Sequence, residues 1–110
     1  VLSGEDPLTI FDRYHDRIKH IHFKDVRPEQ AQQERTDHLS FLQGVKNGMF
    51  TVPGDGMIDF KPIWEAIQKQ HYDGWIVVEA EQDPAKANPF EYALKAKHYL
   101  DTIMTIPQAV

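Results

Sequence analysis

The sequence has no cysteine among its 110 residues, which excludes disulfide-stapled scaffolds and cysteine-ligated zinc or iron–sulfur centres. Its apolar runs are only a few residues long, far short of the roughly 20 residues that cross a bilayer. An excess of basic charge is also lacking. With 17 acidic and 12 basic residues the net charge is −5, which disfavours nonspecific binding to nucleic acid or anionic membranes. We therefore expect a soluble, cytoplasmic protein.

The residues that are present have the composition of a globular protein. Hydrophobic residues make up 41% and aromatic residues 11%, unlike the polar, highly charged composition of disordered chains. No repeat or compositional boundary divides the sequence, so we expect residues 1–110 to form a single segment. The chain begins with Val1 and not Met, so we expect either processing or a piece of a longer chain.

Hydrophobic periodicity predicts helices and strands in strict alternation. The expected strands are 17–26, a short one from 49, and 75–81. The expected helices are 6–16, capped by Asp6; 28–47, with an apolar stripe of Leu39, Phe41, Leu42 and Val45; one capped by Asp59; and a last one capped by Asn88, with Ala93, Leu94, Leu100 and Ile103 facing inward. Alternation of this kind is typical of βαβ units and a parallel sheet. A closed (β/α)8 barrel needs about 250 residues, so if the fold is a barrel the chain holds its last three strands.

The first strand carries an unusual polar face. Its alternate residues His20, His22 and Lys24 point one way, where a packed strand carries Val or Leu. Imidazole is the commonest metal ligand, so the pattern suggests a metal or ligand site. The simpler interpretation is a solvent-facing side of an antiparallel strand. A parallel sheet, which is normally buried on both faces, favours the site.

The last strand carries carboxylates at its C-terminal end. Trp75 and Val77 are followed on the same face by Glu79 and Glu81. Barrel active sites lie at the C-terminal ends of parallel strands, which makes both glutamates candidates. The alternative is that the strand simply emerges into solvent at Glu81.

Other residues suggest chemistry less strongly. The loop PGDGMIDF at 53–60 lacks the P-loop lysine pattern and GxGxxG, so it is expected to be a turn where the backbone approaches a ligand, with Asp55 exposed at its tip. Isolated surface positions are expected for the remaining histidines, and packing roles for both tryptophans: His15, His38, His71, His98, Trp64 and Trp75.

Three segments together resemble one known family. HIHFKDVR at 20–27, FTVPGDGMIDF at 50–60 and GWIVVEAEQDPAKANP at 74–89 are similar to the inosose dehydratase family of the xylose isomerase-like TIM barrels. The first segment is typical of the whole superfamily, and VVEAEQDPAKANP is the more specific one. The resemblance runs from GEDP to about residue 100.

The resemblance implies a fold and a metal site. It implies that the chain is the C-terminal part of a (β/α)8 barrel, with about strands six to eight. It implies one divalent metal held by four side chains, with His22 and Glu79 at two of the matching positions. Two acidic ligands would come from strands absent from this chain. Mn2+ or Co2+ is the implied ion, with Mg2+ or Zn2+ as alternatives.

The resemblance also implies a reaction. It is the dehydration of 2-keto-myo-inositol (scyllo-inosose) to a trihydroxycyclohexane-1,2-dione in myo-inositol catabolism, by metal-assisted enolisation and β-elimination of water. Candidate catalytic residues are Lys24 and Glu81, and candidate substrate-binding residues are His20 and Arg27. The alternatives are a sugar isomerase or epimerase on the same scaffold, and a non-catalytic fragment with an incomplete metal site. A homo-oligomer, or association with the missing part of the barrel, is expected.

Overall fold

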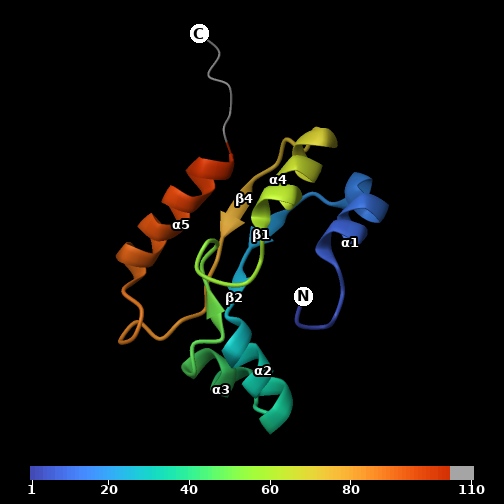
Figure 1. The fold of residues 1–110 in the computed structure, drawn as a ribbon. Coiled ribbons are helices and arrows are strands. Elements are labelled where there is room, and N and C mark those ends of the chain that lie inside the picture. The colour runs from blue at the N-terminus through green and yellow to red at the C-terminus, as the bar shows by residue number, and fades with distance from the viewer. Residues whose placement is uncertain (105–110) are drawn as a thin grey trace.

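Residues 1–104 are described by a computed structural model in which short strands lie among helices (Figure 1). The elements in chain order are α1 (Pro7–Tyr14), a 3-10 turn (His15–Arg17), β1 (Ile21–Phe23), β2 (Asp25–Val26), α2 (Pro28–Asp37), α3 (Phe41–Lys46), β3 (Phe50–Thr51), α4 (Phe60–Lys69), β4 (Ile76–Val78) and α5 (Pro89–Ile103). In this part of the chain, no helix is both long and apolar enough to cross a membrane.

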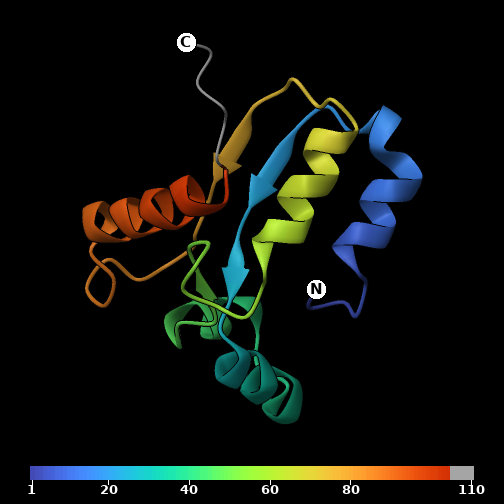
Figure 2. The same ribbon diagram turned by 45° about the horizontal axis from the view of Figure 1, so that its top comes forward.

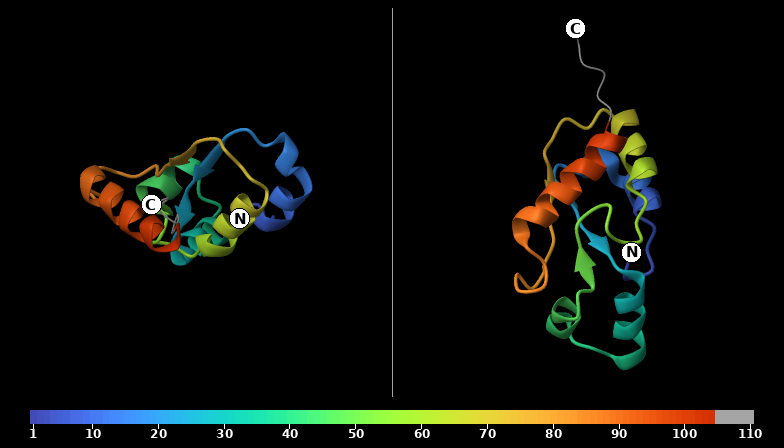
Figure 3. Two further views of the ribbon diagram at one scale, coloured as in Figure 1. Left: turned by 90° about the horizontal axis from the view of Figure 1, so that it is seen from above. Right: turned by 60° about the vertical axis from the view of Figure 1, so that its left-hand side comes forward.

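Two parallel strands form the centre of the fold. β1 and β4 pair with Ile21 opposite Ile76 and Phe23 opposite Val78. Helices α1, α4 and α5 lie on one side of this pair, and the other side is bare (Figures 2 and 3). A parallel pair joined through a helix and covered on one face is the repeating unit of an α/β barrel, so the mixed α/β prediction is confirmed.

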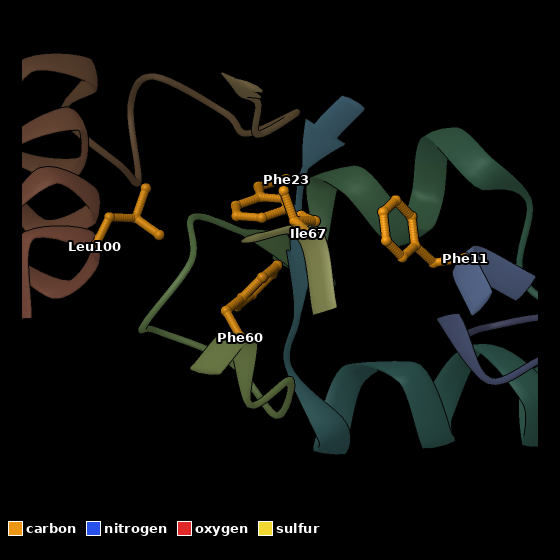
Figure 4. Close-up of a cluster of buried hydrophobic side chains, with 5 residues drawn as sticks. All are labelled: Phe11, Phe23, Phe60, Ile67 and Leu100. Carbon is orange, nitrogen blue, oxygen red and sulfur yellow. The ribbon is translucent and has the colours of Figure 1, made fainter. Parts of the chain in front are cut away.

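The main core lies between the strand pair and the helices. Phe23 projects from β1 onto Phe60 and Ile67 of α4, with Leu100 of α5 on one flank and Phe11 of α1 on the other (Figure 4). Each of these side chains is at most 8% exposed. Burial of a large apolar side chain contributes about 1.5–3 kcal/mol, so this cluster holds the three helices onto the strands.

The overall shape is a thin slab. Its extents are 48 × 32 × 19 Å and its radius of gyration is 15.0 Å, against about 13 Å for a compact domain of this length. A groove of 490 Å³ runs along β1 between α1 and α4, and Ile18, Ile21 and Ile63 are among its apolar lining residues. The strand pair therefore has the open form of a barrel section.

Helix starts follow the predicted capping residues. Asp6 accepts a hydrogen bond from Leu8 N, and Asn88 accepts from Phe90 N and Glu91 N. Asp59 accepts from Lys61 N at the start of α4. A side-chain acceptor at the N-cap satisfies backbone N–H groups that have no partner within the helix. These three helix starts are confirmed.

The prediction of a third parallel strand is wrong. β3 pairs antiparallel with β2, with Asp25 opposite Thr51 and Val26 opposite Phe50. The chain that leaves β1 therefore turns back on itself through β2 and β3. Of the three expected parallel strands, the described residues contain two, β1 and β4. The expected strand 17–26 is accordingly divided at Lys24, where it changes partner from β4 to β3.

The expected helix 28–47 is also divided. It forms α2 and α3, which are separated at His38, a left-handed residue with φ of 51°. α2 has the sequence PEQAQQERTD and buries only Ala31. A helix with no apolar face cannot cover a sheet, so the segment cannot act as the crossover of a βαβ unit. The polar composition of α2 therefore accounts for the return of the chain to β2.

Residues 25–59, which we call the excursion, have a small core of their own. Val26, Ala31, Met49 and Phe50 form it, and Leu2 and Val45 pack against it. Phe41 and Leu42 of α3, predicted to face inward, are 58% and 60% exposed. The excursion leaves from the C-terminal end of β1, which is the end that carries active sites in barrels.

Two further packing predictions are wrong. Trp75 is 83% exposed, whereas Trp64 packs against the main core as predicted. On α5, Leu100 is buried as predicted, whereas Leu94, also predicted to face inward, is 40% exposed. Trp75 immediately precedes β4 and, because side chains alternate along an extended chain, shares a face with Val77 and Glu79.

Candidate functional site

The register of β1 and β4 brings four polar side chains together. His22 lies opposite Val77, and alternate residues of a strand share a face. His22 and Lys24 of the first segment therefore meet Glu79 and Glu81 of the second on the bare side of the strand pair. The predicted grouping of these residues on one face is confirmed by their contacts.

Lys24 is the centre of this group, which we call the β1–β4 cluster. Its Nζ lies 2.6 Å from Glu81 Oε1 and 3.1 Å from Glu79 Oε1. The other carboxylate oxygen of Glu79 contacts His22 Nδ1. The side chains are between 24% and 46% exposed. The cluster is thus internally paired and still open to a ligand from the bare side.

Electrostatics favour the charged forms of Glu79 and Lys24. Hydrogen bonds from His22 and Lys24 hold the pKa of Glu79 below its ordinary value. Burial alone lowers the pKa of Lys24, but its hydrogen bonds to Glu81 and Glu79 outweigh burial, and the pKa of Lys24 is raised. The cluster therefore presents carboxylate oxygens and an ammonium group together.

Two side chains of the cluster are of types that bind divalent metal ions. Within residues 1–104 no group of three or more metal-binding side chains is found. His22 and Glu79 offer one imidazole nitrogen and one carboxylate, a donor set that suits Mn2+ and similar divalent ions. Further ligands would have to come from elsewhere, in keeping with the expectation that two acidic ligands lie outside this chain.

The two predicted substrate-binding residues lie in different surroundings. His20 stacks edge-on against His22, with ring centroids 4.8 Å apart, so it belongs beside the cluster. Arg27 instead donates to Asp55 Oδ2 at 2.8 Å and to Gly48 O at 2.8 Å. The structure gives Arg27 a role within the excursion, and its contact with a substrate stays a prediction.

The glycine-rich loop at 53–60 is built around Asp25, which sequence reasoning missed. Asp25 is 0% exposed and accepts from Val26 N, Gly56 N and Ile58 N at 2.8–3.1 Å. A Cβ on Gly56 would lie 2.4 Å from Asp25 Oδ1. The backbone thus approaches a carboxylate of the same chain, and the expected approach to a ligand is not what requires Gly56.

Asp55 is a second missed residue. It was expected to be exposed at a loop tip, but its side chain is 20% exposed and accepts from Arg27, Thr51 and Lys95 at 2.7–2.8 Å. The position of Asp25 could have indicated its burial, because Asp25 shares a strand face with Ile21 and Phe23, which pack in the main core. Nothing local signalled Asp55, because its partners are spread from residue 27 to residue 95.

The family model described as xylose isomerase-like TIM barrel matches residues 2–103. The chain belongs to the xylose isomerase-like TIM barrel family. Its parallel β1–β4 pair and one-sided helices are what a section of such a barrel requires.

Several curated relatives in this barrel family carry the name inosose dehydratase. The one from Lacticaseibacillus casei is 84% identical over 109 residues, which is 99% of this chain and 37% of the relative. Those from Geobacillus thermodenitrificans and Clostridium beijerinckii are 61% and 55% identical over 100 residues. The chain therefore spans little more than a third of the length of these relatives.

The high identity makes a functional test practical. This chain can replace the matching 109-residue segment of the Lacticaseibacillus casei relative, with which it is 84% identical. We call the product the hybrid protein. In the hybrid protein, the relative supplies the rest of the barrel, and this chain supplies the β1–β4 cluster and the excursion.

Asp55 is expected to make stability fall in acid. Burial raises its pKa, but hydrogen bonds from Lys95, Thr51 and Arg27 outweigh burial and leave the pKa lowered. A lowered pKa contributes stability above the unfolded value of about 3.9, and this contribution is lost as pH falls through the folded pKa. The urea midpoint of the hybrid protein should fall more steeply from pH 5 to pH 3 than that of its Asp55→Asn variant. Equal slopes would contradict this interpretation.

Proposed function

We propose that the protein to which this chain contributes dehydrates an inosose with the help of a divalent metal. The observation that carries the proposal is the His22–Glu79 contact at the C-terminal ends of two adjacent parallel strands. That position is where barrel enzymes place their active sites. The name inosose dehydratase, carried by relatives at up to 84% identity, supports dehydration as the reaction.

The proposed metal site divides between this chain and the rest of the barrel. His22 and Glu79 would be two of its ligands, and Mn2+ or Co2+ suits an imidazole with carboxylates. When bound, such an ion acts as a Lewis acid on a ketone oxygen and stabilises negative charge on it. The other residues of the cluster then have to bind the polyol and move protons.

Lys24 and Glu81 are proposed to act on the substrate. The Lys24 ammonium, drawn toward the bare side by Glu79 and Glu81, can donate to a substrate oxygen. Dehydration removes a proton from the carbon beside the ketone and a hydroxyl from the next carbon, which leave together as water. Glu81 is 39% exposed and is the carboxylate we assign to proton transfer.

Lys24→Met is expected to lower kcat in the hybrid protein by about a hundredfold or more, because methionine keeps the apolar stem but cannot donate. Mn2+ binding should remain, since neither His22 nor Glu79 is changed. Lys69→Met on the exposed surface of α4 is the matched control and should turn over normally. Unchanged turnover in Lys24→Met would remove Lys24 from the mechanism.

The rest of the barrel is the proposed partner of this chain. β4 is the only strand that pairs with β1 among residues 1–104, and the apolar groove of 490 Å³ lies along β1. An unpaired strand edge exposes N–H and C=O groups that favour pairing with a further strand. The proposal is that a parallel strand from the remainder of the protein pairs there.

The hybrid protein tests the proposed function directly. With Mn2+ it should dehydrate scyllo-inosose, and its product should show the ultraviolet absorbance of a conjugated dione-derived enol. A ketohexose assayed in parallel distinguishes the alternative of an isomerase or epimerase. Isomerisation of the ketohexose without dehydration of the inosose would replace the proposed function with that alternative.

A further inference from the structure

We propose that Thr51 and Asp55 position the carboxylates of Glu79 and Glu81, through a hydrogen-bonded link to Gln82. We call the Thr51 hydroxyl and the Asp55 carboxylate the 51/55 node. The proposal deepens the proposed function, because it concerns how the same site is held in place. Through Asp55, the glycine-rich loop at 53–60 would help to position the β1–β4 cluster.

The carboxylates that need positioning stand outside regular structure. β4 ends at Val78, and Glu79 follows it with its N–H donating to Phe23 O at 2.9 Å. Residues 79–83 have no helical or strand assignment. Because such a segment lacks the backbone hydrogen bonds of a strand pair, its position depends on side-chain contacts. The orientation of Glu79 and Glu81 therefore depends on what fastens the segment beyond Glu79.

The next fastening point is the link to β3. Gln82 Nε2 donates to Thr51 Oγ1 at 3.4 Å, and Thr51 Oγ1 donates to Asp55 Oδ2 at 2.7 Å. Thr51 is 0% exposed, so its hydroxyl has no water to exchange with these partners. The segment with both glutamates is thus held at Phe23 on one side and at Thr51 on the other.

The far end of the same connection returns to the node. β4 is joined to α5 by residues 79–88, and α5 carries Lys95, whose Nζ lies 2.8 Å from Asp55 Oδ1. Arg27 holds the other oxygen of Asp55 at 2.8 Å and lies 3.4 Å from the Tyr92 hydroxyl on α5. Gln82, through the Thr51 hydroxyl, and α5, through Lys95, are therefore linked to the same carboxylate of Asp55.

The strand that carries Thr51, β3, also contacts the opposite side of the cluster. Thr51 lies opposite Asp25 in the β2–β3 pair, and Asp25 is the neighbour of Lys24. Phe50, beside Thr51, carries the Lys24 ammonium over its ring at 4.9 Å. One short strand, β3, is thus in contact with Lys24 on one side and with the glutamate segment on the other. A change at Thr51 should therefore shift Lys24 relative to the segment that carries Glu79 and Glu81.

Thr51→Val in the hybrid protein tests the proposal, because valine keeps the buried volume and removes the hydroxyl. The Kd for Mn2+, measured from the free-ion electron paramagnetic resonance signal, should rise about 10- to 100-fold, as is usual when a group that supports a metal ligand is lost. Thr51→Ser keeps the hydroxyl and should restore most of the affinity. Asp101→Asn, which breaks the exposed Lys97–Asp101 pair, is the control and should not change Kd.

Gln82→Met gives an independent test at the other end of the link, where misfolding is not expected. It should raise the same Kd, and the double variant Thr51→Val/Gln82→Met should be no weaker than the worse single variant, because both remove one link. A lowered melting temperature with unchanged Kd in both single variants would overturn the proposal and leave the node a purely structural feature.

The metal readout separates this inference from the proposed function. If the hybrid protein binds Mn2+ without dehydrating inosose, the proposed reaction fails, while a raised Kd in Thr51→Val still supports positioning. If the unsubstituted hybrid protein does not bind Mn2+, the metal role of Glu79 is wrong and the positioning proposal falls with it.

Discussion

Replacing Glu79 by glutamine is expected to abolish metal-dependent turnover in the hybrid protein. The amide is neutral and is a much weaker ligand than the carboxylate, and it loses the charge that attracts both Lys24 and a divalent ion. We expect the Kd for Mn2+ to rise by at least about 100-fold and kcat/KM for the inosose to fall by at least about 1000-fold. Calorimetric titration with Mn2+ and a turnover assay measure the two effects.

The matched control for Glu79→Gln is Glu65→Gln. Glu65 is exposed on α4, away from the strand face that carries the cluster, and its replacement should leave both quantities unchanged. The melting temperature of Glu79→Gln should stay near that of the parent, because Glu79 is itself partly exposed. Metal affinity equal to that of the unsubstituted protein would show that Glu79 is not a ligand.

Asp25→Ala is the substitution expected to cost most stability. It removes the acceptor of Val26 N, Gly56 N and Ile58 N from a site that is 0% exposed. An unsatisfied buried donor costs about 1–3 kcal/mol, so three of them should cost about 3 kcal/mol at least. We expect a large fall in soluble yield and in the urea midpoint of the hybrid protein.

A graded series distinguishes lost hydrogen bonds from lost charge at Asp25. Burial raises the pKa of Asp25 and outweighs the hydrogen bonds from Ile58, Val26 and Gly56, so the stability that Asp25 contributes is lost as pH rises through its folded pKa. Asp25→Asn keeps one acceptor oxygen and should lie between the parent and Asp25→Ala. If Asp25→Ala were as stable as Asp25→Asn, the three hydrogen bonds would not be the reason that Asp25 is needed.

Local patterns predicted the parts of the fold that depend on neighbours in sequence. The N-caps Asp6, Asp59 and Asn88 are confirmed because a cap is a contact over two or three residues. The alternation of side chains along each strand predicted that His22 would share a face with Lys24, and that Glu79 would share a face with Glu81. Because β1 and β4 pair in parallel, with His22 opposite Val77, these two faces form one continuous surface.

The rest of the site depends on contacts that leave no local pattern. Asp55 is bound by residues 28 positions before it and 40 positions after it. β3 is only two residues long, too short for its alternation to reveal whether its partner is parallel. The antiparallel return also depends on the polar surface of α2, which the expected helix 28–47 combined with the apolar residues of α3.

The separate core of the excursion divides the chain into parts with different tolerance to change. The excursion is joined to the rest of the chain by hydrogen bonds from Lys95 to Asp55, from Gln82 to Thr51 and from Lys86 to Lys46 O, and by Ile58, which packs against the main core. Substitutions or insertions in α2 and α3 can therefore accumulate without disturbing the strands, as long as those junctions are kept. Such an arrangement would let related barrels acquire new selectivity by exchanging one segment, while the residues that hold the chemistry stay the same.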